Sequence, residues 1–168
     1  DDVSYEGMVH ATAVVWPAVL AAAELVAANG RDSLTAFIVG VEAEYALGRA
    51  FTHDLFWRGW WTTGLLGAIG AAIGAAKVMG ATTELMRQAV CIAACQTTGP
   101  YVLVGSPVKP VACGRAAELG LQGGRALSDV LRIAAEAVRG AAYDGLVRNV
   151  LAGLMVSVVA DRIVELCA

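Results

Sequence analysis

Two side chains of this chain have the chemistry of an acid–base site. His10 follows a short polar stretch and precedes an apolar run, and imidazole groups exchange protons near neutral pH. Lys109 stands between Val108 and Pro110 and is one of only two lysines. Its side chain can bind a carboxylate as a cation or, if desolvated, act as an acid–base group. The alternatives are that His10 only fills a helix start and that Lys109 is an ordinary surface lysine.

Acidic and aromatic residues accompany these two candidates. Asp1 and Asp2 precede His10 and can orient its ring, or they are solvated charges near the start of the chain. Three tryptophans gather within five residues at Trp57, Trp60 and Trp61. They line the mouth of a pocket or pack in a core or interface, since large aromatic rings serve both purposes.

Composition argues against several other functions. The net charge of −3 and the scattered arginines of the 168-residue chain argue against a nucleic-acid partner. Cys91 and Cys95 lie one helical turn apart, and with two histidines in all no metal site is expected. No cofactor is expected either. The uncharged run from Thr62 to Ala76 is too short to span a membrane. Reduced thiols favour a cytoplasmic protein.

The element that must position the candidate groups lies over residues 62–79. Its sequence is almost wholly Gly, Ala, Leu and Ile, with a stripe of small residues at helical spacing. Thr62 or Thr63 is expected to cap this helix, and Gly80 is expected to end it. Glycine inside a helix costs about 1 kcal/mol relative to alanine. We therefore expect a buried helix whose neighbours approach it very closely.

The remaining periodicity predicts further helices and no strand. The predicted helices cover about 12–28, 32–50, 62–79, 82–97, 111–122, 128–139 and 143–166. A loop is expected over 51–61, and an irregular connection that holds Lys109 is expected over 97–114 because of its Gly and Pro residues. The sequence thus predicts one all-α domain over residues 1–168. It is a bundle of about seven helices around the Gly/Ala-rich one.

Several runs of the sequence, taken in order, resemble the helical domain of the MmgE/PrpD family. They are DD, HATAVVWPAVLAAAE, GVEAEYALGRA, RGWWTTGLLGAIGAAIGAAKVMG, AVCIAACQTTG and KPVACGRAAELG, within residues 1–124. The family includes 2-methylcitrate dehydratase and cis-aconitate decarboxylase. The resemblance implies an all-α core that pairs into a dimer, a separate lid domain, and chemistry next to a carboxylate of a small acid.

By position, the resemblance also implies site residues. Asp2, His10 and Lys109 match the family's catalytic groups. The expected substrate-binding residues are Asp1, Tyr5, Trp57, Arg58, Trp60, Trp61 and Thr62. The chain departs from the family in having Trp61 where the family has histidine. We expect the lid domain to be absent, and we expect residues 125–168, which match nothing in the family, to form a helical tail.

These features lead to a functional hypothesis. The chain is expected to be a small-molecule lyase or isomerase of the dehydratase type, with a pocket altered toward a more apolar substrate that bears a carboxylate. Lys109 holds the carboxylate and His10 moves a proton. One alternative is a cyclase or isomerase of a hydrophobic biosynthetic intermediate. Another is a non-catalytic relative that binds a ligand or a partner chain. A homodimer and a lid-bearing partner chain are the expected assemblies.

Overall fold

Five α-helices and one short 3-10 helix make up the regular structure of the described part of the chain. The computed structural model describes residues 2–137, with side chains as far as residue 125. The elements are α1 (Thr12–Leu25), α2 (Gly30–Trp57), α3 (Thr62–Val78), α4 (Thr83–Gln96), η1 (Tyr101–Leu103) and α5 (Val108–Ala137). Within these residues the only extended pairing is two isolated bridges. The prediction of an all-α fold is therefore confirmed for residues 2–137.

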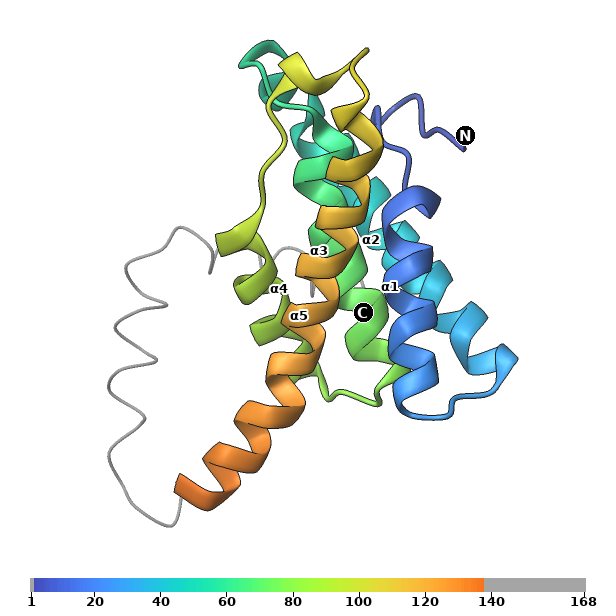
Figure 1. Ribbon diagram of the computed structural model, residues 1–168, viewed down its shortest axis with the longest axis vertical. Coiled ribbons are helices and arrows are strands. Elements are labelled where there is room, and N and C mark those ends of the chain that lie inside the picture. The colour runs from blue at the N-terminus through green and yellow to red at the C-terminus, as the bar shows by residue number, and fades with distance from the viewer. Residues whose placement is uncertain (1, 138–168) are drawn as a thin grey trace.

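Helix α3 packs against each of the other four α-helices of the described residues, α1, α2, α4 and α5 (Figure 1). From residue 62 to residue 76 every residue except Leu65 is buried. A helix that is apolar on all sides has no face for water, so it needs neighbours all round. Two core clusters meet on α3, one shared with α2 and α4 and the other with α1 and α5.

Glycines allow the helices to approach so closely. A Cβ atom on Gly40 of α2 would lie 2.7 Å from the carbonyl oxygen of Gly70 of α3. A Cβ atom on Gly120 of α5 would lie 2.7 Å from the carbonyl oxygen of Ala68. Because backbone atoms cannot move aside as a flexible side chain can, any larger residue at these positions would push two helices apart.

The predicted break at Gly123 and Gly124 is wrong, because α5 runs through both residues. A Cβ atom on Gly124 would lie 2.9 Å from the Cβ atom of Ala75, and one on Gly123 would lie 3.1 Å from the carbonyl oxygen of Ala89. These glycines do not form a turn; they allow α5 to pack closely against α3 and α4. The two helices expected over 111–122 and 128–139 are thus one helix as far as Ala137. The helix expected over 143–166 lies outside the described residues.

Helix α2 is longer than predicted at both ends. Asn29 caps it by accepting the backbone N–H of Asp32 at 3.0 Å, so the helix begins before the expected cap at residues 32–33. Its far end covers most of the expected loop over 51–61. Thr52 is buried there and donates its hydroxyl to the carbonyl of Gly7, which ties the end of α2 to the N-terminal segment. Tertiary contacts therefore extend a helix that local signals would have ended.

The termini of α3 match the predicted range but not the predicted cap. Trp61 occupies the N-cap position without a side-chain hydrogen bond. The hydroxyls of Thr62 and Thr63 instead form hydrogen bonds with the N-terminal segment. After α3, Gly80 adopts a positive φ of 74°, as expected for a helix end. Thr82 or Thr83 is a predicted cap for the helix over 82–97, and Thr82 takes this role in α4 by accepting the backbone N–H of Leu85.

Helix α5 begins at Val108, inside the stretch predicted to be irregular. Lys109 is therefore helical rather than in a loop. Pro110 follows it in the first turn, where the missing N–H of proline costs little because first-turn N–H groups have no helical partner. Helix α5 begins at the same end of the bundle as the N-terminal segment (Figure 1). Among residues 2–137, no helix has the length and hydropathy required to cross a membrane.

Candidate active site

The segment before α1 is held against the start of α3 by two threonines. The Thr62 hydroxyl donates to the carbonyl of Met8 at 2.7 Å. The backbone N–H of His10 donates to the Thr63 hydroxyl at 3.1 Å. Both threonine side chains are almost fully buried, so these bonds form away from competing water. The N-terminal end of α3 thereby determines where His10 lies.

The imidazole of His10 contacts the main chain of Asp2. Its Nδ1 lies 2.7 Å from the Asp2 carbonyl oxygen. A carbonyl only accepts hydrogen bonds, so Nδ1 must carry the proton in this contact. In the neutral ring, Nε2 then has a free lone pair. His10 is thus set up to accept a proton through Nε2.

Lys109 is paired with an aromatic ring. Its Nζ lies 5.8 Å from the ring centroid of Trp61, which is the geometry of a cation–π contact. Trp61 is only 6% exposed. Its ring packs on Gly64, where an added Cβ would come within 2.9 Å of the indole. Trp61 is therefore a rigid support beneath the ammonium group.

These groups line one hollow of about 300 Å³ at the end of the bundle. Five of the site residues predicted from the sequence line this hollow: Tyr5, His10, Trp61, Thr62 and Lys109. The other lining residues are Val3, Met8, Phe56, Tyr101 and Val104. The wall is thus mostly apolar and aromatic, with one ammonium group and one imidazole.

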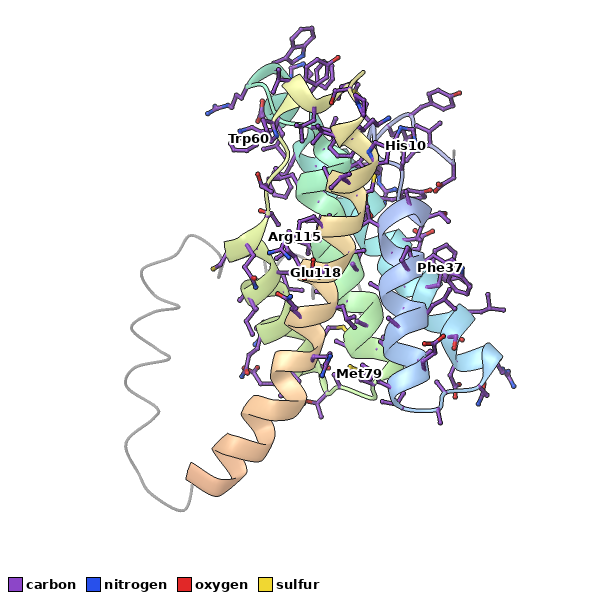
Figure 2. The ribbon with its side chains drawn as sticks, viewed as in Figure 1. His10, Phe37, Trp60, Met79, Arg115 and Glu118 are labelled. Carbon is purple, nitrogen blue, oxygen red and sulfur yellow. The ribbon has the colours of Figure 1, made fainter. Side chains whose placement is uncertain are left out.

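Other predicted site residues do not line this hollow. Trp57 and Arg58 are exposed, Trp57 to 75%, and neither is among the lining residues. Trp60 is at the same end of the bundle as His10 (Figure 2) but also stays outside the hollow. Asp2 lies behind His10 rather than in the wall. Asp1 lies outside the described residues.

Two aromatic residues of the wall were missed from the sequence. Phe56 and Tyr101 pack edge to face, with ring centroids 5.0 Å apart. The backbone brings them together, because the Tyr101 N–H donates to the carbonyl of Gly59 at 2.7 Å. Phe56 stood in the predicted loop beside Trp57, so an aromatic cluster was visible there. Nothing local in the sequence connects Tyr101 to it.

A buried acid, Glu44 of α2, was also missed. Its side chain is 0% exposed, and neither carboxyl oxygen has a hydrogen-bond partner among the described residues. Burial raises the pKa of Glu44 well above its usual value, and the charge of Asp2 raises it further. Ionised carboxylates are costly in an apolar interior, so the neutral acid is favoured here. Glu44 is close enough to the site to interact electrostatically with Asp2.

Cys113 lies one helical turn after Lys109 on α5. Burial raises the pKa of its thiol, Lys109 lowers it, and Glu44 raises it. Burial is the largest of these effects, so the thiol form is favoured over the reactive thiolate. Cys113 is also not among the residues that line the hollow, so of the described lining residues His10 and Lys109 are the candidate reactive groups.

Comparison with known proteins identifies similar sequences. A family model described as the MmgE/PrpD N-terminal domain matches residues 1–126. Cis-aconitate decarboxylase from Aspergillus terreus is 37% identical over 131 residues, which are 74% of this chain and 27% of the relative. Cis-aconitate decarboxylase-like protein oryM from Aspergillus oryzae is 33% identical over 107 residues, which are 59% of this chain and 22% of that relative. The chain thus spans about a quarter of the length of these relatives.

Proposed function

Because the chain belongs to the MmgE/PrpD family, we propose that the hollow around His10 and Lys109 is the active site of a lyase or isomerase. The reaction is acid–base chemistry at a carbon next to a carboxylate. The observation that carries this proposal is that a histidine with a free Nε2 and a lysine line the same hollow. The relatives named as cis-aconitate decarboxylase support a lyase, since their named activity removes a carboxyl group.

Lys109 binds the carboxylate of the substrate in this proposal. It lies in the first turn of α5, where the helix dipole adds positive potential. The ammonium group also stabilises the negative charge that develops on the carboxylate as the neighbouring carbon loses a proton. Trp61 beneath it carries no charge, so it does not neutralise the lysine as an acidic neighbour would.

His10 takes the proton from that carbon through Nε2. The electron pair of the broken C–H bond then forms a double bond and expels a leaving group from the next carbon, which is a lyase reaction. Alternatively, in a substrate with a double bond beside that carbon, the electron pair forms a new double bond to the neighbouring carbon, the original double bond opens, and the imidazolium returns the proton at its far carbon, which is an isomerase reaction. The contact of Nδ1 with Asp2 keeps the ring oriented through both steps.

The wall favours a monocarboxylic acid with an apolar body. Phe56, Trp61 and Tyr101 provide aromatic surface, and among the described residues that line the hollow Lys109 is the only lysine or arginine. A tricarboxylate would leave two charges without partners, which is costly in a partly closed site. The same wall supports the second candidate function, isomerisation of a hydrophobic biosynthetic intermediate.

Three exposed side chains, one lining the hollow and two next in the chain to lining residues, support a further part of the proposal, that another polypeptide covers the hollow. Tyr5 is 87% exposed, Val102 82% and Trp57 75%. Apolar side chains gathered around a site are typical of interaction surfaces. We expect either a second copy of this chain or a chain carrying a lid domain to close the hollow and exclude water from the reaction.

Binding is tested by calorimetric titration with short, branched monocarboxylic acids and with their amides. Lys109→Met keeps the length of the side chain and removes its charge. Charge-assisted hydrogen bonds contribute about 1.5–3 kcal/mol, so the Kd of the acids is expected to rise about 10- to 100-fold. Lys77→Met, at an exposed position near the end of α3, is the control. Equal affinity in the wild type and Lys109→Met would remove Lys109 from the site.

Catalysis is tested separately by solvent deuterium exchange. Acids that bind are incubated in D₂O and followed by NMR for loss of the proton next to the carboxylate. The wild type is expected to exchange this proton, and His10→Asn, which has no basic nitrogen, is not. Acids that bind to the wild type without exchange or product would instead favour a non-catalytic ligand-binding protein.

A further inference from the structure

Tyr45 of α2 reaches the site from behind the imidazole. Its hydroxyl donates to the Asp2 Oδ2 atom at 3.3 Å. The ring is half-buried and packs against two core clusters, one between α2, α3 and α4 and the other between α1 and α2. Tyr45 is not in the wall of the hollow. A core residue is thereby connected to the segment that carries His10.

Asp2 connects this tyrosine to the imidazole. Its Oδ2 atom accepts from the Tyr45 hydroxyl and from the backbone N–H of Thr12, the latter at 3.2 Å. Its main-chain carbonyl accepts from His10 Nδ1 at 2.7 Å. The Thr12 N–H on α1 and the Tyr45 hydroxyl on α2 thus hold the carboxylate of Asp2. The main-chain carbonyl of the same residue accepts the hydrogen bond from the imidazole.

A fixed carbonyl matters because a free imidazole has two neutral tautomers. A proton on Nδ1 leaves Nε2 as the base, and a proton on Nε2 makes that atom a donor instead. The choice is set by the hydrogen bond that the other nitrogen makes. If Asp2 moved, the carbonyl would no longer select the tautomer or hold the ring plane.

From this geometry we infer that Tyr45 is a positioning residue, which holds Asp2 in place and through it sets the tautomer and orientation of His10. The expected effect of Tyr45 on turnover rests on the proposed function, whereas its expected effect on the tautomer of His10 does not. Nothing in the spacing of the sequence brings Tyr45 to Asp2, because 43 residues separate them.

The charges around Tyr45 are consistent with its acting as a donor. Burial raises the pKa of its hydroxyl, and the charge of Asp2, the hydrogen bond to it, and the charges of Glu44 and Glu42 raise it further. The phenol therefore keeps its proton at and above neutral pH.

Tyr45→Phe tests the inference, since it removes the hydroxyl and keeps the ring that packs in the core. The first measurement is the 15N chemical shifts of the His10 imidazole without substrate. The wild type is expected to show mainly the Nδ1–H tautomer and Tyr45→Phe a mixture of both. The second measurement is turnover, where kcat is expected to fall about tenfold with little change in KM, as for a misplaced catalytic group.

Two further variants distinguish positioning from a purely structural role. Asp2→Asn removes the charged acceptor and should change the tautomer as Tyr45→Phe does, and the double variant should change it no further. Thr35→Val removes an exposed hydroxyl elsewhere on α2 and should leave the imidazole shifts unchanged. A loss of thermal stability in Tyr45→Phe with an unaltered tautomer would show that Tyr45 only packs.

The outcomes also separate this inference from the proposed function. A wild-type imidazole protonated mainly on Nε2, or an identical tautomer population in Tyr45→Phe, would overturn the role of Tyr45. A changed tautomer in Tyr45→Phe, together with a wild type that exchanges and converts no acid, would support Tyr45 as the residue that orients His10. That same result would contradict the proposed lyase or isomerase.

Discussion

The ammonium group of Lys109 lies over the indole of Trp61, with Nζ 5.8 Å from the ring centroid. Such contacts contribute about 0.5–1 kcal/mol when exposed and about 2 kcal/mol when shielded from water. The contact holds the lysine at the hollow without neutralising its charge. Trp61 stands where the family resemblance implies histidine.

Replacing Trp61 by histidine is expected to give the hollow a second, pH-dependent cation. Ordinary imidazoles have a pKa of about 6.5, so the variant should bind dicarboxylic acids more tightly as the pH falls through that value. Titrations at pH 5.5 and pH 8 measure the effect. Trp61→Phe keeps an aromatic ring without a titrating group and serves as the control. Similar gains at low pH in both variants would contradict this explanation.

Two neighbouring aromatic residues should differ in their effect on binding. Phe56 lines the hollow, whereas Trp57 is 75% exposed and does not. Phe56→Ala is expected to weaken binding of apolar acids several-fold to about tenfold, because apolar contact area contributes about 25 cal/mol per Å². Trp57→Ala is expected to leave the Kd unchanged. The comparison uses calorimetry with acids of increasing chain length, and the loss in Phe56→Ala should increase with length.

Close approach of α2 and α3 predicts that Gly70→Ala destabilises the bundle. A Cβ there would lie 2.9 Å from the Gly40 carbonyl oxygen and from the Glu44 Cβ. Overpacking of this kind costs about 1–3 kcal/mol of unfolding free energy. Among the described residues, no atom lies within 4 Å of a Cβ added to Gly114 of α5, so Gly114→Ala should stabilise the helix by about 0.5–1 kcal/mol. Urea denaturation measures both, and equal effects would contradict the packing explanation.

The burial of Glu44 predicts that the free energy of unfolding depends on pH. Its pKa is raised in the folded state by burial and then by Asp2, while an unfolded chain has glutamate near pKa 4.3. The folded state therefore binds the proton more tightly. The stability contributed by the neutral acid is complete below about pH 4. It is lost as the pH rises toward the raised folded-state pKa.

Glu44→Gln removes this titration. The unfolding free energy of the variant relative to the wild type should increase with pH, at no more than about 1.4 kcal/mol per pH unit. Urea denaturation of both proteins from pH 4 to pH 9 measures the difference. Glu44→Met, also uncharged, should show the same slope. A difference that does not vary with pH would mean that Glu44 is not a buried neutral acid.

Local patterns in the sequence were sufficient for part of this description. The helical class, the range of α3, the Gly80 terminus and the Thr82 cap depend on composition, periodicity and short-range backbone preferences. His10 and Lys109 were recognisable as reactive groups, because few residue types carry a base or a cation. These features depend on the residue itself or on its near neighbours, so a single sequence reports them.

Long-range packing decided the rest. Gly123 and Gly124 resemble a helix break, but they lie inside α5 because α3 and α4 approach them there. The hydroxyl of Thr62 resembles a cap, but it donates to Met8 instead. Contacts between segments that are distant in the sequence bring three further residues close to the site, namely Tyr101, Glu44 and Tyr45. The sequence by itself determined which residues can form helices and exchange protons. The tertiary structure decided which of them meet, because the free energy of close helix packing exceeds the weak preferences of any local stretch.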